Sequence, residues 1–373
     1  MANTEIQNAA AWLPAIGADL EVKPAPYTSP RENEIAVRNH AVAINPVDWI
    51  IRQAGSLAFP WIKYPFVLGS DVAGEVVEVG SAVSRFKVGD RVLGHAVGQD
   101  KKRNSSAEGG FQTYTVLLAH MATPIPESLS YESAAVLPLA VSTAACGLFQ
   151  KDALALASPS VPPKPPGQAL LVWGGSTSVG SNAIQLAAAA GYEVITTASP
   201  KNFDYVKRLG ASQVFDYNSK TVVKDVSHAL EGKTLAGALA IGKGSAEPCI
   251  DIVGACDGNK FVSVASFDLT FPDRPGFNLQ LVRMIYQFLW FKLSTRLESR
   301  ARGIRTNYIF GISLMNNEVG SLIYVDFLPK ALAAGQYVAA PDPLVVGKGL
   351  ELVQAGVDLQ KKGVSAKKVV VSL

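Results

Sequence analysis

The chain has 373 residues, of which 48% are hydrophobic and 17% charged, so its composition predicts a compact protein whose length suits two domains. Its net charge is +3, and its basic residues are scattered rather than gathered in a stripe, which argues against nucleic-acid binding. The three cysteines show no paired spacing, which excludes a disulfide framework and fits a reducing compartment. Because no targeting or membrane-spanning pattern is visible, we expect a cytoplasmic protein with no membrane partner.

The first part of the chain has the pattern of an all-β domain. Short β-rich runs at 33–38, 41–44, 72–79 and 91–97 are separated by turn signals, and the polar stretch 99–110 reads as a loop. Many short strands with glycine and proline between them favour a barrel-like arrangement.

From residue 130 onward, helices and strands alternate. The alanine-rich stretch 131–148 predicts a helix broken at Pro138, and five prolines within 158–167 predict an irregular segment. Beyond it we expect strands at 170–173, 193–197, 213–215, 238–241 and 261–265, and helices at 179–190, 203–209 and 221–230. This alternation predicts a doubly wound parallel sheet covered by helices. The tail is expected to form a helix at 348–354 and a closing strand at 367–373.

A glycine-rich turn follows the strand predicted at 170–173. Gly175 lets the backbone turn where a side chain would clash, and Gly180 lets the next helix pack against the strand. The helix start presents N–H groups and a positive dipole end to a pyrophosphate. These groups belong to Ser176, Thr177, Ser178 and Val179. The strand-turn-helix context predicts a dinucleotide site, and a nucleophile elbow is disfavoured because its second glycine is missing.

The end of the next strand indicates the cofactor. Enzymes that use NAD place Asp or Glu about 20 residues after the glycines, where it binds the ribose 2′-hydroxyl. The segment 195–202 contains no carboxylate, whereas Ser199 offers a hydroxyl and Lys201 a positive charge for a 2′-phosphate. Lys201 could also be a solvated residue at a helix start, but the missing acid favours NADP(H).

Further motifs occur in an order that resembles the medium-chain dehydrogenase/reductase superfamily over nearly the whole chain. They are Asn45-Pro46-Val47-Asp48, the glycine-rich run 68–80, and the Phe-Lys-Val-Gly-Asp-Arg-Val run 86–92. Through 198–204 and 214–217, the chain is similar to the zinc-independent quinone oxidoreductase branch and its fungal trans-acting enoyl reductases. The resemblance implies an α/β protein with a GroES-like β-barrel domain at 1–138, completed by 340–373, and a Rossmann domain at 139–339.

The resemblance also implies where NADP(H) binds, in the cleft between the two domains. The nicotinamide would lie beside Pro46, Val47, Asp48, Trp49 and Thr143. Ala265 and the segment Ser365, Ala366 and Lys367 would close over the same side. The adenosine 2′-phosphate would lie among Ser199, Pro200, Lys201, Asn202 and Tyr217.

Zinc alcohol dehydrogenases share this architecture, and the resemblance shows where their metal ligands would fall. The first cysteine falls at Asn45, the Gly-His-Glu motif reads Gly69-Ser70-Asp71, and the second cysteine falls near Leu139. These residues lack the thiolates and imidazole of a catalytic zinc site, so we predict no metal. His95 stands alone in the sequence and is interpreted as a surface residue.

Without a metal, reduction of a conjugated double bond is the favoured chemistry, because it does not strictly need a Lewis acid. We predict NADPH-dependent hydride transfer to an activated alkene or a quinone, on a small apolar or conjugated substrate. A metal-free carbonyl or alcohol reductase and a non-catalytic NADPH-binding sensor remain alternatives. The proton donor is not identified: relatives carry Lys at the position of Ile50, and Tyr64, Trp49 and Arg52 are nearby candidates.

The aromatic stretch 271–307 is the least typical part of the chain. It could line an apolar pocket, serve as a dimer surface or form a buried core helix. Its apolar positions Leu281, Ile285, Phe288 and Leu289 suit one face of a buried or interfacial helix. A monomer and a homodimer are both compatible with the sequence.

Overall fold

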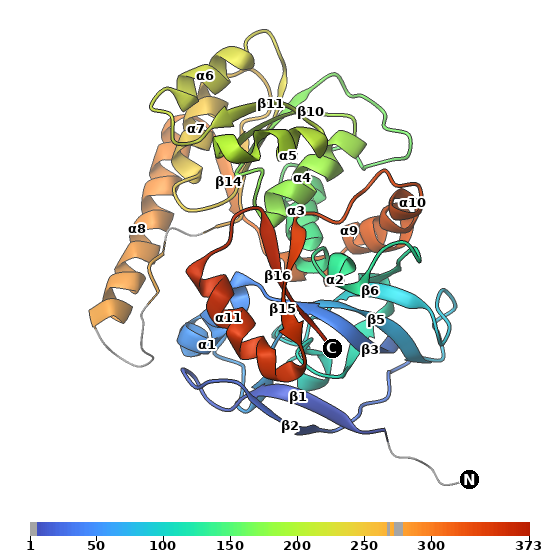
Figure 1. Cartoon of the computed structure of the whole chain (residues 1–373). Helices are drawn as coiled ribbons and strands as arrows, with labels where there is room; N and C mark the ends of the chain where they lie inside the picture. Colours follow the sequence, from blue (N-terminus) through green and yellow to red (C-terminus); the bar gives the residue numbers. More distant parts are fainter. Residues whose placement is uncertain (1–5, 267–268, 272–278) are drawn as a thin grey trace.

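The structure, a computed structural model, describes residues 6–266, 269–271 and 279–373 (Figure 1). It contains a β-rich domain in the lower half of the view and an α/β domain above it, and the strands β15 and β16 run between the two. The α/β fold class with a GroES-like domain and a Rossmann domain is confirmed.

The β-rich domain has two sheets. The larger sheet has the order β15-β16-β3-β5-β6-β8, with β7 also paired to β3, and the smaller has the order β2-β1-β4. The larger sheet comprises β15 (Asp342–Lys348), β16 (Lys367–Ser372), β3 (Glu34–Ala43), β5 (Asp71–Val79), β6 (Arg91–His95), β7 (Tyr114–Leu118) and β8 (Ala122–Pro124). The smaller comprises β1 (Asn8–Leu13), β2 (Glu21–Ala25) and β4 (Phe66–Val67).

One strand, β3, replaces the two that were predicted at 33–38 and 41–44. Its pairing with β5 shifts register between Asn39 and Ala41, a bulge that explains why the apolar pattern breaks at His40. Through β16, the C-terminal segment joins this sheet beside β3, with Val371 opposite Val42.

The α/β domain has one parallel six-stranded sheet, of order β11-β10-β9-β12-β13-β14. In chain order this is 3-2-1-4-5-6, the strand order of a Rossmann fold. The strands are β9 (Ala169–Trp173), β10 (Glu193–Ala198), β11 (Ala211–Asp216), β12 (Leu235–Ala240), β13 (Phe261–Val264) and β14 (Arg305–Tyr308). All residues of β9 are buried, as the uniformly apolar run at 170–173 predicted for a central parallel strand.

Helices cover this sheet and connect it to the β-rich domain. Those of the α/β domain are α3 (Pro138–Phe149), α4 (Ser178–Ala189), α5 (Phe203–Arg208), α6 (Val222–Ala229), α7 (Ala246–Ala255), α8 (Leu279–Ala301), α9 (Glu318–Ser321) and α10 (Leu328–Ala333). The others are α1 (Pro46–Ala58), α2 (Tyr131–Ala134) and α11 (Val353–Lys362). The break predicted at Pro138 separates α2 from α3. Residues 131–149 are apolar and long enough to cross a membrane by those criteria alone, but 78% of the window is buried within the protein.

A helix follows β15 as predicted, but the bounds predicted for it, 348–354, are wrong. Strand β15 extends to Lys348, and Gly349 then adopts a φ of 111°, which is incompatible with a helix. A short 3₁₀ turn, Leu350–Leu352, leads into α11, which begins only at Val353.

Helix α8 runs along the outer edge of the α/β domain (Figure 1). It packs on α7 and β14, and Met284, Thr295 and Ser299 are buried on that side. Its other side carries exposed apolar residues: Tyr286, Leu289, Trp290, Leu293 and Leu297. The alternative of a buried core helix is therefore wrong for the described part of this segment, because these apolar side chains are exposed. Residues 272–278 of the same stretch lie outside the described residues.

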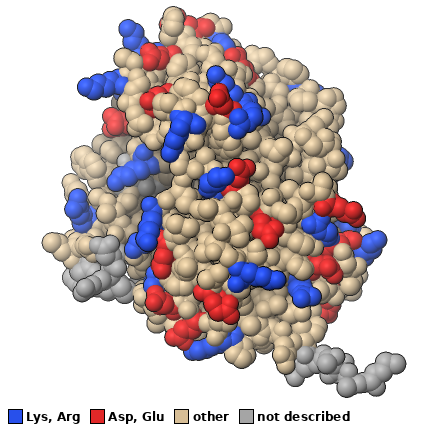
Figure 2. Space-filling model, viewed as in Figure 1, with Lys and Arg blue, Asp and Glu red and all other residues tan. Residues whose placement is uncertain are grey.

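Figure 2 shows Lys and Arg side chains interspersed with Asp and Glu over the viewed face. On this face, charges of both signs alternate rather than forming a stripe of one sign.

Candidate functional site

The glycine-rich turn between β9 and α4 has the geometry of a phosphate-binding turn. Gly174 has a φ of 82°, and a Cβ atom at Gly180 would overlap the carbonyl oxygen of Gly174. Thr177 is the N-cap of α4, where its Oγ1 accepts a hydrogen bond of 3.0 Å from the N–H of Gly180. The remaining N–H groups of the first turn of α4 can therefore face a bound anion.

This turn lies where the strand order of the sheet reverses. Strands β10 and β12 flank β9 on opposite sides, and a Cβ at Gly174 would lie 2.6 Å from the carbonyl oxygen of Ile241, just beyond β12. In open α/β sheets, ligands bind at this switch point, beyond the carboxyl ends of the strands. The glycine-rich turn predicted from the sequence thus lies at the switch point of the sheet, where a ligand is expected.

The residues predicted around the adenosine end come together beyond β10. Ser199 donates a hydrogen bond of 3.3 Å to the hydroxyl of Tyr217, and Pro200 and Lys201 are exposed beside them. Asn202 is buried, and its amide lies 3.4 Å from the hydroxyl of Ser365. Ser365 therefore adjoins the adenosine side, whereas Lys367 points outward and pairs with Asp342 at 2.9 Å.

The residues predicted beside the nicotinamide come from the first turn of one helix, the middle of another and the end of a strand. Pro46, Val47, Asp48 and Trp49 form the first turn of α1, Thr143 lies on α3, and Ala265 follows β13. The Oδ2 atom of Asp48 accepts 2.7 Å from the N–H of Asn45. Burial raises the pKa of Asp48 to about 7, and the neighbouring Asp71 adds to this shift. Thr143 donates to the carbonyl of Leu139 at 2.8 Å.

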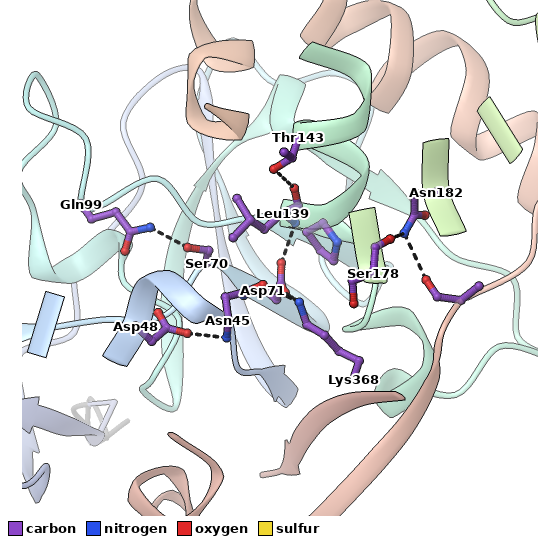
Figure 3. A network of polar contacts seen from close by, with 12 residues as sticks. Asn45, Asp48, Ser70, Asp71, Gln99, Leu139, Thr143, Ser178, Asn182 and Lys368 are labelled. Atoms are coloured by element: carbon purple, nitrogen blue, oxygen red, sulfur yellow. Dashed lines mark hydrogen bonds and ion pairs between the residues drawn. The ribbon is translucent and has the colours of Figure 1, made fainter. Parts of the chain in front are cut away.

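A buried ion pair lies directly beneath these helix starts, and sequence reasoning missed it. The ammonium of Lys368 is 2.8 Å from Oδ2 of Asp71 and donates a hydrogen bond to Oδ1 of Asn45. Asn45 Nδ2 donates to the same Asp71 oxygen at 2.8 Å, and the other oxygen accepts 2.6 Å from the N–H of Leu139 (Figure 3). Asp71 is fully buried and Lys368 is 4% exposed.

His95 is buried, so its interpretation as a surface residue is wrong. It lies opposite Asp71 in the β5–β6 pairing, and its Nδ1 is 2.9 Å from the hydroxyl of Ser142. That hydroxyl is 2.8 Å from Tyr324, which donates to the carbonyl of Pro138 at 2.7 Å. Burial lowers the pKa of His95 to about 4, so its ring is neutral at physiological pH.

Two family models match the chain: the alcohol dehydrogenase GroES-like domain over residues 31–127, and the zinc-binding dehydrogenase domain over residues 178–256. A dehydrogenase of Monascus ruber, pigH, is 55% identical and the match covers 98% of this chain and 99% of that protein. The chain belongs to the medium-chain dehydrogenase/reductase family. Another relative, the trans-enoyl reductase himH of Aspergillus japonicus, is 38% identical with 98% and 97% covered.

Solved structures of this family share the fold at low identity. The quinone oxidoreductase of Coxiella burnetii superposes with a TM-score of 0.67 at 21% identity, with 99% of this chain and 100% of that one covered. The CurK enoyl reductase gives a TM-score of 0.72 at 19% identity, with 98% and 99% covered. The family membership makes this chain an oxidoreductase with a fold that binds a nicotinamide cofactor.

The zinc that one family model implies does not fit the residues present. Among the described residues, no group of three or more His, Cys, Asp and Glu side chains could hold a metal ion. Where the resemblance puts the zinc-binding motifs, the chain carries Asn45, Gly69-Ser70-Asp71 and Leu139, and Lys368 already contacts one oxygen each of Asn45 and Asp71. A catalytic zinc needs thiolate, imidazole or free carboxylate ligands.

The three candidate proton donors of this family member differ in their surroundings. Arg52 faces away from the helix starts, because it donates to the carbonyl of Ala18 and pairs with Asp19. Trp49 meets Phe271 edge to face at 5.1 Å. Burial raises the pKa of Tyr64, and its hydroxyl has no hydrogen-bond partner within the described ranges. The packing of Tyr64 against Gly55 favours a core role.

Proposed function

We propose that the chain is an NADPH-dependent reductase that transfers hydride to an activated alkene or to a quinone without a metal ion. We also expect a cytoplasmic protein that acts on a small apolar or conjugated substrate, as a monomer or a homodimer. The observation that carries the cofactor preference is the pair of hydroxyls of Ser199, just after β10, and Tyr217, just after β11, because an NAD enzyme has a carboxylate at the end of the strand that corresponds to β10.

The surroundings of this pair support NADPH. Ser199 and Tyr217 lie 3.3 Å apart, and Lys201 is exposed next to them with no ion-pair partner among the residues described. The nearest acid in register is Asp216, on the neighbouring strand β11 opposite Ala198. Its Oδ1 accepts hydrogen bonds of 3.0 and 3.1 Å from Asn218. A 2′-phosphate here would meet two hydroxyls and an ammonium.

Support for the reaction comes from the helix starts and from the relatives. A bound nicotinamide supplies a hydride. The first turn of α1 and Thr143 flank its predicted place, and the edge-to-face pair of Trp49 and Phe271 offers an apolar surface to a conjugated substrate. One relative at 38% identity is named a trans-enoyl reductase. No free set of metal ligands is available to activate an alcohol among the described residues.

The reaction is tested by anaerobic oxidation of NADPH with a panel of enones, enoyl thioesters, quinones and aldehydes. We expect turnover with enones, enoyl thioesters or quinones, and no loss of rate when a chelator is added. Turnover with aldehydes alone would favour the carbonyl reductase. Binding of NADPH without any turnover would favour the sensor, and a rate abolished by the chelator would refute the metal-free reaction.

The cofactor preference is tested by quenching of tryptophan fluorescence, which Trp173 should report because it lies directly before the phosphate turn. Lys201→Ala should weaken NADPH binding by about tenfold, the loss of one charge-assisted hydrogen bond, and leave NADH binding unchanged. The exposed Lys207→Ala, six residues further on in α5, is the matched control. Equal losses for NADPH and NADH, or equal affinities in the unmodified protein, would refute the preference.

A further inference from the structure

Helix α8 has apolar residues on two opposite sides, and one of these sides is packed. Met284, Thr295 and Ser299 are buried on the packed side, against α7 and β14. On the opposite side, apolar residues recur every three or four positions and so form one strip along the helix. This strip, the outer face of α8, consists of Leu279, Val282, Tyr286, Leu289, Trp290, Leu293 and Leu297, all of which are exposed. Because a surface helix ordinarily turns polar side chains toward water, such a strip indicates a contact surface.

The outer face lies at the periphery of the molecule. In Figure 1 the other labelled helices and strands lie to one side of α8. The helix has 23 residues and is therefore about 35 Å long, since each residue adds about 1.5 Å. A helix of this length at the edge of the molecule can lie along a flat surface with its whole outer face in contact.

Cations surround the outer face. With a rotation of about 100° per residue, Arg283 and Arg296 fall on opposite flanks of it, and Arg300 follows at its C-terminal end. All three are exposed, and none has an ion-pair partner within the part of the chain that the structure describes. Burial raises the pKa of Glu298, the acid of this helix, and Glu247 of α7 adds to the shift. The acid is therefore turned toward α7, and the charge around the outer face is positive.

This charge pattern favours an anionic lipid surface over a second copy of the chain. Two copies joined through their outer faces would bring cations toward cations, with no acid of α8 turned outward to pair with them. Anionic headgroups supply the opposite charge along both flanks. Tyr286 and Trp290, which belong to the outer face, are of the residue types that prefer the boundary between headgroups and hydrocarbon.

We propose that α8 is an interfacial helix through which the protein binds the surface of an anionic phospholipid bilayer. The outer face inserts its apolar side chains among the headgroups, and the surrounding arginines contact lipid phosphates while their stems cover apolar surface. Such a helix needs neither a spanning segment nor a targeting signal, so the expectation of no membrane partner, which depends on those two patterns, does not cover it. None of the residues assigned to the cofactor takes part, and lipid binding is therefore independent of the proposed reaction.

The test measures binding of the full chain to sedimented vesicles of phosphatidylcholine, with and without about 30% phosphatidylserine. We expect at least about tenfold tighter binding to the anionic vesicles and a loss of affinity as salt is added. The double variant Arg296→Gln, Arg300→Gln should bind the anionic vesicles about thirtyfold more weakly, since each cation near such a surface contributes about fivefold. The matched control is Lys361→Gln, Lys362→Gln at the exposed end of α11, which should bind like the unmodified protein.

The apolar contact has its own readout. Anionic vesicles should shift the tryptophan fluorescence to the blue, and Trp290→Phe should abolish this shift while retaining the binding, because Trp290 is the tryptophan of the outer face. The double variant Leu289→Gln, Leu293→Gln should weaken binding by at least about tenfold. Circular dichroism and NADPH binding, which these exposed substitutions should leave unchanged, check that each variant is folded.

Equal binding of the unmodified protein to anionic and neutral vesicles, or binding to neither, would overturn the proposal. Equal losses in the arginine variant and the lysine control would overturn it too, because the attraction would then be spread over the whole surface. A blue shift that survives Trp290→Phe would place the lipid contact elsewhere on the molecule. A lipid-free dimer that Leu289→Gln, Leu293→Gln converts to a monomer would assign the outer face to a second copy instead.

Discussion

The phosphate turn is formed by consecutive residues, 174–180, whereas the cluster of Asn45, Asp71 and Lys368 joins side chains up to 323 positions apart. In the turn, charge recognition depends on backbone N–H groups, and the glycines matter because a side chain would not fit. In the cluster, the backbone is ordinary strand and helix, and one buried cation satisfies the polar groups. The phosphate turn is therefore specified by a short stretch of sequence, whereas the cluster exists only once the whole chain has folded.

Breaking the cluster should have the largest effect. Asp71→Asn leaves the ammonium of Lys368 buried without a carboxylate, and we expect the free energy of unfolding to fall by about 3–5 kcal/mol. Denaturant titration measures the loss. The double variant Asp71→Asn, Lys368→Met is the control and should recover most of it. A loss below about 1 kcal/mol for the single variant would mean that the pair is solvated in solution.

A substitution in the phosphate turn should lower the stability less than Asp71→Asn does, but it should weaken cofactor binding. Gly180→Ala forces a Cβ atom against the carbonyl oxygen of Gly174, and we expect a loss of about 1–3 kcal/mol together with at least about tenfold weaker NADPH binding. Gly254→Ala is a matched control, because the nearest atom to a Cβ at that helical glycine would be the flexible side chain of Arg302, at 3.2 Å. Similar effects of the two substitutions would show that Gly180 has no special role.

Asp48, which lies between the helix start and the cluster, should make stability depend on pH. Its folded pKa of about 7 exceeds the ordinary value of 3.8, so the folded protein holds a proton there that the unfolded chain releases. Stability is therefore lost as pH rises between these values, by up to about 1.4 kcal/mol per pH unit from this group.

Asp48→Asn removes this dependence while keeping an oxygen that can accept from Asn45. The variant should gain stability relative to the unmodified protein as pH rises from about 4 to about 7. His95, whose pKa is lowered, contributes the opposite slope, and it cancels when the two proteins are compared at each pH. A constant difference across this range would contradict the raised pKa.

Substitutions on the outer face of α8 should have the smallest effect on the free energy of unfolding. Leu289 is 60% exposed, so Leu289→Lys should change the free energy of unfolding by less than about 0.5 kcal/mol. Met284→Ala, on the buried face of the same helix, should cost about 2–5 kcal/mol. A large effect of Leu289→Lys, accompanied by a smaller mass in sedimentation, would identify this face as a surface between copies of the chain.

The sequence predicted the central strands of the α/β domain well because β9, β10, β12 and β13 are almost wholly buried, whereas the partly exposed edge strand β14 was not predicted. Strand β9 is a run of apolar residues between a proline-rich segment and the glycine turn, and such a run is easy to recognise. Strands β1 and β2 were not predicted. Strand β2 is exposed and contains Pro24, and it therefore shows neither alternation nor an apolar run.

The candidate site likewise has one part that the sequence predicted and another part that it missed. The turn and the hydroxyls at Ser199 follow local rules, whereas Lys368 stands beside Lys367 and no local rule says which of the two is buried. The strand period does not decide between them, because Val370, in phase with Lys368, and Val369 and Val371, in phase with Lys367, are all buried. His95 was misjudged for a related reason: its partners, Ser142 and Tyr324, come from distant segments.

The distance between Asn45 and Lys368 along the chain also has a consequence for protein synthesis. While a ribosome makes the first domain, β16 does not yet exist, so residues 41–43 of β3 lack the strand that pairs with them on one side, and Asp71 lacks its counter-charge. An unpaired strand edge can pair with other chains. The β-rich domain should therefore need protection by chaperones until the α/β domain has been made and β16 can join the sheet.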